Sequence, residues 1–183
     1  RFVALSIPAL EDSGITAVGV VRSMTAVVVS EDAGSVMDMI MHVPPLLEAF
    51  KGFCTKALCS ESLMFLLDAE AFSVLLEKKQ EAPTDSSSAA GCFDRYVEIV
   101  DKYIRESSPF EVNIESKTRN EILRATGKEI FIELTQAGKA QMLDVAVREI
   151  GKMLTDSLYA KFRATMEYKN VQDQLSALEE LGG

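Results

Sequence analysis

The most specific pattern in the chain is the stretch Val112-Asn113-Ile114-Glu115-Ser116-Lys117-Thr118-Arg119. Its second half is polar and charged, as in a short surface helix, and Thr126-Gly127 marks where such an element ends. The stretch therefore predicts a turn followed by a short helix between Glu111 and Leu123. Asparagine is a preferred N-cap residue, so Asn113 is a candidate cap for a helix over residues 114–119.

Helical periodicity surrounds this stretch on both sides. Apolar residues recur three and four positions apart within residues 36–40, 46–53, 63–76, 93–104, 143–154 and 159–178. Pro44-Pro45 should end one helix and begin the next, because proline is tolerated in a first helical turn. The composition of residues 80–91 predicts a flexible loop. The fold class that follows is all-α, with about eight to ten helices in a single domain.

The first 34 residues are the least informative part of the sequence. Residues 17–21 and 26–29 are rich in β-branched side chains, which favour short strands. A packed helix is the alternative, because periodicity does not distinguish a buried apolar helix from a strand. We favour helix in places, and divide the chain into an N-terminal extension (1–34) that can pack on the bundle, a helical domain (35–171) and a C-terminal helix end (172–183).

Composition excludes several classes of protein. The net charge is −9, which argues against binding of duplex nucleic acid and against adhesion to anionic lipid. The three cysteines, Cys54, Cys59 and Cys92, form no CxxC pair, and His42 is the one histidine. We therefore expect free thiols in a reducing compartment, no metal site and no cofactor. No apolar run reaches the roughly 20 residues that a membrane-spanning helix needs.

Three segments, in order and correctly spaced, resemble the regulator-of-G-protein-signalling (RGS) domain. Phe50-Lys51-Gly52-Phe53 with residues 61–65 and 68–72 is similar to the family's F-x-x-F, E-N-L-x-F and C-E-x-F run. Residues 112–119 are close to the family's V-N-(I/L)-(D/E)-S-x-T-R. Residues 144–162 resemble its helix D-x-A-x-x-x-I-x-x-L-x-x-D-S-Y-x-x-F.

The resemblance implies a GTPase activator of the Gα subunit of heterotrimeric G proteins, with no catalytic centre of its own. Gα already carries a catalytic arginine and a water-orienting glutamine, so a partner that stabilises the switch segments in their transition-state arrangement lowers the barrier. The resemblance implies that Asn113 contacts that glutamine, because an amide can donate and accept. Thr118 and Arg119 are expected to fix the loop. The implied residues in contact with Gα are Glu61, Ser62, Asn113, Met153, Ser157, Leu158 and Lys161.

Several positions depart from the family pattern. Ser62 stands where asparagine is usual, and Lys161, in place of arginine, loses the bidentate fork. Aligning Tyr159 and Phe162 with the family's aromatics puts Ser157-Leu158 at its Asp-Ser positions. A shift by one residue would rotate both aromatics by about 100°, and burial of each is worth ~1.5–3 kcal/mol, so we favour the aromatic register. A π-bulge would satisfy both registers.

Two functions remain open at this point. The first is a GTPase activator that binds Gα in its GTP or transition-state form, located in the cytoplasm and recruited to the inner face of the plasma membrane. The alternative is a non-catalytic RGS-like scaffold or protein-interaction module, which the changes at Ser62, Leu158 and Lys161 would suit.

Overall fold

The computed structural model describes residues 33–81 and 86–182, and every regular element in these ranges is helical. The predicted all-α class is therefore confirmed. The chain divides into two compact units. We call residues 33–53 and 155–182 the terminal unit and residues 54–154 the central unit, and each is described by itself.

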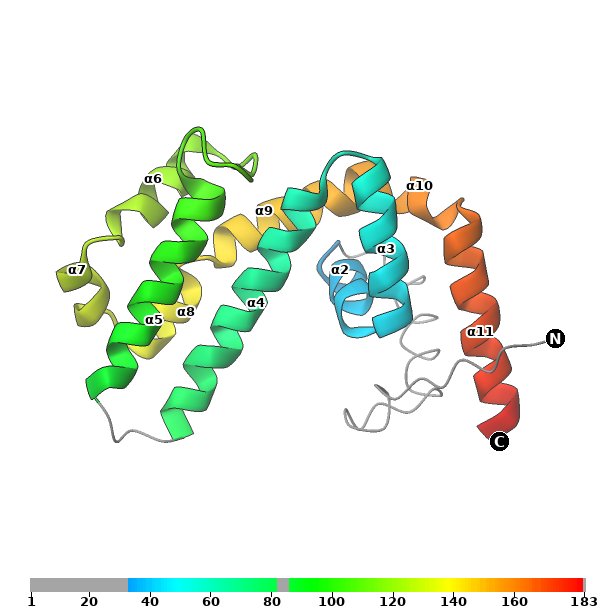
Figure 1. The fold of residues 1–183 in the computed structure, drawn as a ribbon, viewed down its shortest axis with the longest axis horizontal. Helices are drawn as coiled ribbons and strands as arrows, with labels where there is room; N and C mark the ends of the chain where they lie inside the picture. Colours follow the sequence, from blue (N-terminus) through cyan, green and yellow to red (C-terminus); the bar gives the residue numbers. More distant parts are fainter. Residues whose placement is uncertain (1–32, 82–85, 183) are drawn as a thin grey trace. The chain divides into compact units, whose positions relative to one another are not determined.

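The central unit is built from six α-helices and one π-helical segment among the described residues. They are α4 (Ser60–Glu81), α5 (Ser86–Ile99), the π-helix η1 (Val100–Ile104), α6 (Ser116–Arg124), α7 (Lys128–Glu133), α8 (Gln136–Gln141) and α9 (Asp144–Leu154). α4 and α5 lie side by side (Figure 1), while α4, α6 and α8 each contact α9. α9 therefore connects α4, α6 and α8 within this unit.

Aromatic side chains fill the core of the central unit. The Tyr96 ring lies 6.0 Å from that of Phe72 and 5.4 Å from that of Phe131, measured between centroids. Its hydroxyl donates a 2.8 Å hydrogen bond to the carbonyl oxygen of Ile122, at the end of α6. Tyr103, on the next turns of the same face, contacts Phe65. The apolar face predicted for residues 93–104 is thus the face that packs inward.

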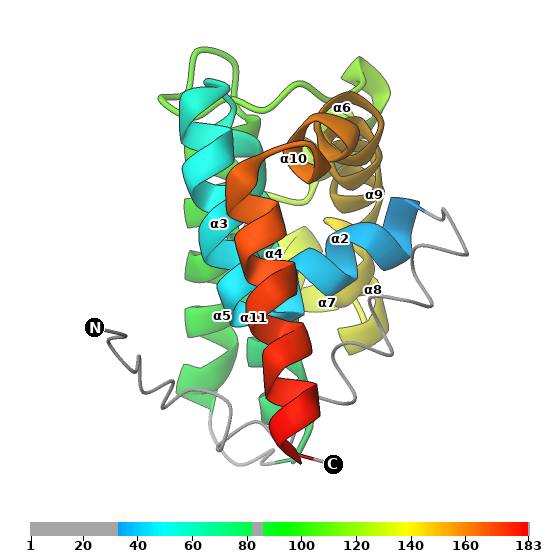
Figure 2. The same cartoon turned by 90° about the vertical axis from the view of Figure 1, so that its right-hand side faces the viewer.

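The terminal unit is formed by both ends of the described chain. Its elements are α2 (Ala33–His42), all but the last three residues of α3 (Pro44–Lys56), the π-helix η2 (Thr155–Tyr159), α10 (Ala160–Arg163) and α11 (Met166–Gly182). Phe162 lies at its centre, with ring centroids 5.0 Å from Phe50 and 5.2 Å from Tyr168. α11 leaves α10 at a sharp bend (Figure 2), where the Thr165 hydroxyl accepts from the Tyr168 amide.

The loop predicted over residues 80–91 is wrong at both ends, because helices extend into it from each side. α4 continues to Glu81, and α5 begins at Ser86. Serine is a poor residue inside helices but a favoured one at their N-terminal ends, so Ser86-Ser87-Ser88 start a helix as readily as they prolong a loop. The prediction for residues 1–34 lies almost wholly outside the described residues, with α2 beginning at Ala33.

Neither membrane-spanning nor metal-binding features occur in the described ranges. No helix of residues 33–81 and 86–182 has both the length and the apolar character needed to cross a bilayer. The same residues contain no group of three or more histidine, cysteine, aspartate or glutamate side chains able to hold a metal ion.

Candidate protein-interaction site around Asn113

Asn113 lies on an extended segment between η1 and α6 in the central unit. Its neighbours Val112 and Ile114 are buried, with 1 % and 7 % of their surface exposed, whereas Asn113 is exposed. The backbone amide of Val112 donates a 2.9 Å hydrogen bond to the carbonyl oxygen of Tyr103. Alternate side chains of extended backbone point to opposite sides. The buried side chains of Val112 and Ile114 therefore orient the Asn113 side chain toward solvent.

The structure does not place Asn113 at the N-cap of the following helix. α6 begins at Ser116, its N-cap residue is Glu115, and its first helical hydrogen bond runs from the Arg119 amide to the Glu115 carbonyl. Within residues 33–81 and 86–182, the Asn113 amide makes no hydrogen bond to another residue. The capping role that the sequence alone left open is therefore wrong, and the amide is available to a partner.

Glu149 of α9 accepts hydrogen bonds at the N-terminal end of α6. One carboxylate oxygen of Glu149 accepts a 2.8 Å hydrogen bond from the Glu115 backbone amide, and the other accepts one from the buried Thr118 hydroxyl. Nothing in the sequence singled out Glu149, which resembles any charged residue of an amphipathic helix. Its partners precede it by more than 30 positions, so no local pattern could have revealed the contact.

Arg119 holds the segment from its other side. Its guanidinium donates to the carbonyl oxygens of Ile104 and Val112, the latter at 3.3 Å, and pairs with the Glu111 carboxylate at 3.0 Å. The Ile104 carbonyl lies at the end of η1, and the Val112 carbonyl directly precedes Asn113. Arg119 and Glu149 therefore fix the backbone before and after the asparagine.

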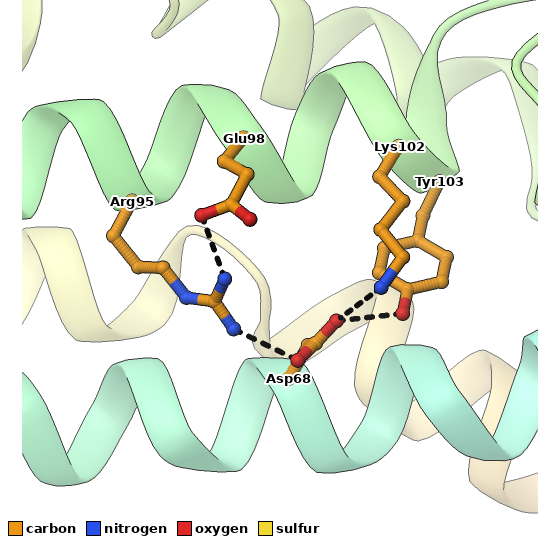
Figure 3. A network of polar contacts seen from close by, with 5 residues as sticks. All are labelled: Asp68, Arg95, Glu98, Lys102 and Tyr103. Atoms are coloured by element: carbon orange, nitrogen blue, oxygen red, sulfur yellow. Dashed lines mark hydrogen bonds and ion pairs between the residues drawn. The ribbon is translucent and has the colours of Figure 1, made fainter.

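A polar network joins α4 to α5 and η1 (Figure 3). Asp68 on α4 accepts hydrogen bonds from Arg95 at 2.8 Å, Lys102 at 3.1 Å and the Tyr103 hydroxyl at 2.6 Å, and Arg95 also pairs with Glu98. Burial alone would raise the pKa of the Asp68 carboxyl. The hydrogen bonds from Tyr103 and Lys102, with the nearby positive charges, outweigh burial and lower that pKa. Tyr103 thus anchors Asp68 with its hydroxyl and Val112 with its carbonyl.

Comparison with known proteins identifies the family. Residues 36–171 match the family model of the regulator of G protein signaling domain. The chain belongs to the RGS domain family. The family assignment made from the three sequence segments is therefore confirmed.

Two curated relatives of the RGS domain match the chain. It is 28% identical to "Regulator of G-protein signaling 16" of Mus musculus over 140 residues, which are 76% of this chain and 60% of that protein. It is 29% identical to the protein of the same name of Rattus norvegicus over 134 residues, 73% of this chain and 57% of that protein. The chain thus spans less than two thirds of the length of these relatives.

Three further residues expected at the Gα contact of the RGS domain lie in the central unit. Glu61 is half-buried in the first turn of α4, where its charge suits the positive end of the helix dipole. Ser62, next to it, is buried, with 3 % of its surface exposed. Met153 is half-buried on α9, one turn beyond Glu149 and therefore on the same face.

The loop before α4 presents an apolar side chain. Leu58 has a φ of 56° and is 89% exposed, and the Cys59 amide donates 3.1 Å to the Cys54 carbonyl. The Leu58 amide donates to the carbonyl of Thr55. These two bonds form the Schellman motif that closes many helices, in which the left-handed position is usually glycine. A leucine there exposes a large apolar group at a strained site.

The remaining expected contact residues lie in the terminal unit. Ser157 and Lys161 are exposed and Leu158 is half-buried. Residues 155–159 form the π-helix η2, so the bulge that would reconcile the two registers is present. Phe162 is buried and Tyr159 half-buried, while Asp156 and Ser157 stay exposed. Phe162 keeps its place in the core, as the burial argument predicted, whereas Tyr159 is only partly buried.

Proposed function

We propose that this RGS domain accelerates GTP hydrolysis by a Gα subunit. The observation that carries the proposal is the Asn113 amide, which is exposed, without a partner among the described residues, and set on backbone fixed from both sides. Such a group binds with little loss of conformational entropy, because its segment is ordered beforehand. The domain needs no catalytic group of its own, since Gα supplies the arginine and the glutamine that act on the phosphate.

The mechanism is selective stabilisation of the transition state. The switch segments of Gα move, and hydrolysis requires them in one arrangement. An amide that donates to one switch group and accepts from another is satisfied in that arrangement alone. Binding energy gained there and not in the ground state lowers the barrier. The partner is therefore Gα in its GTP or transition-state form, and the domain would act at the cytoplasmic face of the plasma membrane, where Gα is held.

In the central unit, the residues proposed to contact Gα are Asn113, Glu61 and Met153. In the terminal unit, they are Ser157, Leu158 and Lys161. Ser62 is left out because its buried hydroxyl offers little surface to a partner. Lys161 would contribute a point charge in place of the planar fork of an arginine.

The test is single-turnover GTP hydrolysis by purified Gα subunits of several classes, with and without the domain. Asn113→Ala should reduce the acceleration by at least about tenfold, because preorganised polar contacts in a transition state are commonly worth that much or more. Asn120→Ala is the matched control, since Asn120 is an exposed asparagine on α6. Failure to accelerate any Gα class, or equal loss in both variants, would contradict the proposal.

A second candidate function is a non-catalytic RGS-like interaction module. The burial of Ser62 and the presence of Lys161 favour it, because both reduce the set of polar groups offered to Gα. Binding can be measured to Gα carrying GDP, and to Gα carrying GDP with aluminium fluoride. Preference for the aluminium fluoride form supports the activator. Equal binding to both forms without acceleration supports the interaction module.

A further inference from the structure

The start of α6 lacks the side-chain caps that usually complete a helix. The first amides of any helix have no partner inside it. In a capping box, the N-cap side chain bonds to the amide three positions on, and a glutamate there bonds back to the N-cap amide. Here the N-cap residue is Glu115, whose side chain makes no capping bond, and the position three residues on is Thr118.

Glu149 supplies the missing acceptor from another helix. Its carboxylate accepts from the Glu115 amide at 2.8 Å, as the glutamate of a capping box would. The Thr118 hydroxyl, at the position that such a glutamate would occupy, donates to the other carboxylate oxygen. The negative charge also lies at the positive end of the α6 dipole. One side chain of α9 thus completes the capping of α6.

This contact bears on Asn113 because only Ile114 separates the asparagine from Glu115. Ile114 is buried, so the segment cannot pivot about it without exposing an apolar side chain. Fixing the Glu115 amide therefore fixes the Asn113 backbone on its C-terminal side. On the other side, Arg119 holds the Val112 carbonyl.

We propose that Glu149 is a positioning residue for the interaction of this domain with Gα: it holds the Asn113 segment in its binding conformation by capping α6 from α9. The proposal rests on the proposed function for its effect on Gα. Its structural part, the hydrogen bond to the Glu115 amide, can be tested without any partner.

The first experiment measures amide hydrogen exchange by NMR in the unbound full chain. Glu149→Ala should speed exchange at the Glu115 amide by about 10- to 100-fold, which is the range for losing a hydrogen bond to a charged group. Glu149→Gln keeps an acceptor oxygen and should stay within about threefold of the wild type. Glu121→Gln, at an exposed glutamate of α6, is the control. Unchanged exchange in Glu149→Ala would overturn the proposal.

The second experiment is a double-mutant cycle measured as acceleration of Gα hydrolysis. Glu149→Ala should reduce the acceleration by about tenfold in the wild-type background, and by much less when Asn113 is already alanine, because groups acting together are not additive. Glu149→Gln should rescue most of the loss. Equal losses in both backgrounds would show that Glu149 acts only through general stability and would overturn the proposal.

The two experiments separate the possible failures. If the wild-type domain accelerates no Gα, the proposed function fails and the exchange measurement alone decides whether Glu149 holds the segment. If Glu149→Ala folds poorly, Thr118→Val removes one of the two bonds while keeping the side-chain shape. It should then raise exchange at Glu115 in the same direction, by a smaller factor. No rise in that variant would count against the proposal.

Discussion

Asp68 accepts three hydrogen bonds from α5 and η1, so its replacement by asparagine is a sharp test of the network. Asparagine has nearly the same shape but offers one acceptor oxygen and turns an N–H₂ group toward donors. If its oxygen serves Lys102 and Tyr103, it loses Arg95. If it serves Arg95, the Tyr103 hydroxyl is left in a buried residue without its acceptor.

The expected cost follows from exposure. The side chains of Asp68, Arg95 and Lys102 keep 24%, 28% and 32% of their surface exposed. Solvent therefore partly screens the ion pairs of Asp68 with Arg95 and Lys102. Each pair contributes about 0–1 kcal/mol to the free energy of unfolding. The Tyr103 bond is shielded, and a hydrogen bond to a charged group contributes about 1.5–3 kcal/mol there. Asp68→Asn removes both ion pairs and either weakens or breaks the Tyr103 bond, so we expect it to lower the free energy of unfolding by about 1–3 kcal/mol near neutral pH.

The lowered pKa of Asp68 determines how its contribution to stability changes with pH. The pKa of Asp68 is lowered in the folded state, whereas the pKa of an aspartate in an unfolded chain is about 3.9. The contribution of the carboxylate is therefore fully present above the unfolded pKa and is lost as the pH falls through the folded one. The difference in stability between wild type and Asp68→Asn should shrink in that acidic range.

Urea unfolding of the full chain, followed by far-UV circular dichroism, measures both effects. Asp94→Asn is the control, because Asp94 is exposed on the adjoining helix α5. Two results would refute the reasoning: a cost for Asp68→Asn no larger than for Asp94→Asn, or a difference from the wild type that is unchanged in acid.

Two further predictions concern the α3–α4 loop. Leu58→Gly should raise the free energy of unfolding by about 0.5–1 kcal/mol in the same urea assay, because glycine adopts a φ of 56° without strain; a fall in stability would show that the leucine side chain packs within the fold. Burial is the main cause that raises the pKa of both the Cys54 and the Cys59 thiols, so few thiolates exist at neutral pH. A disulfide reagent with peptide mapping should label Cys59 slowly and Cys54 only after unfolding, and rapid labelling of native Cys54 would contradict this.

Sequence periodicity was sufficient to predict most of the packing. Tyr96, Tyr103 and Phe162 were expected on buried faces, and all three are buried. Helical spacing reports burial directly, because one face of each helix must be apolar to pack. The all-α class and the family followed from such local patterns.

The support of the Asn113 segment could not be predicted in the same way. Glu149 acts on Glu115 and Thr118 from another helix, and a contact between distant positions leaves no trace in the spacing of a single sequence. The same limit affects Ser62, whose burial depends on what packs over α4. The capping role of Asn113 was a fair local inference, but α6 begins only at Ser116, and the acceptor for its N-cap amide comes from α9.

Capping of α6 by α9 also affects how the molecule is made. During synthesis, Glu115 leaves the ribosome before Glu149, and domains emerge from their N-terminal side. Until α9 has followed, the first turn of α6 has no acceptor for its leading amide, so the Asn113 segment cannot reach its final form. A nascent or truncated chain that stops before α9 would therefore lack one of the contacts that fix the Asn113 segment, even with α4 and α5 already in place.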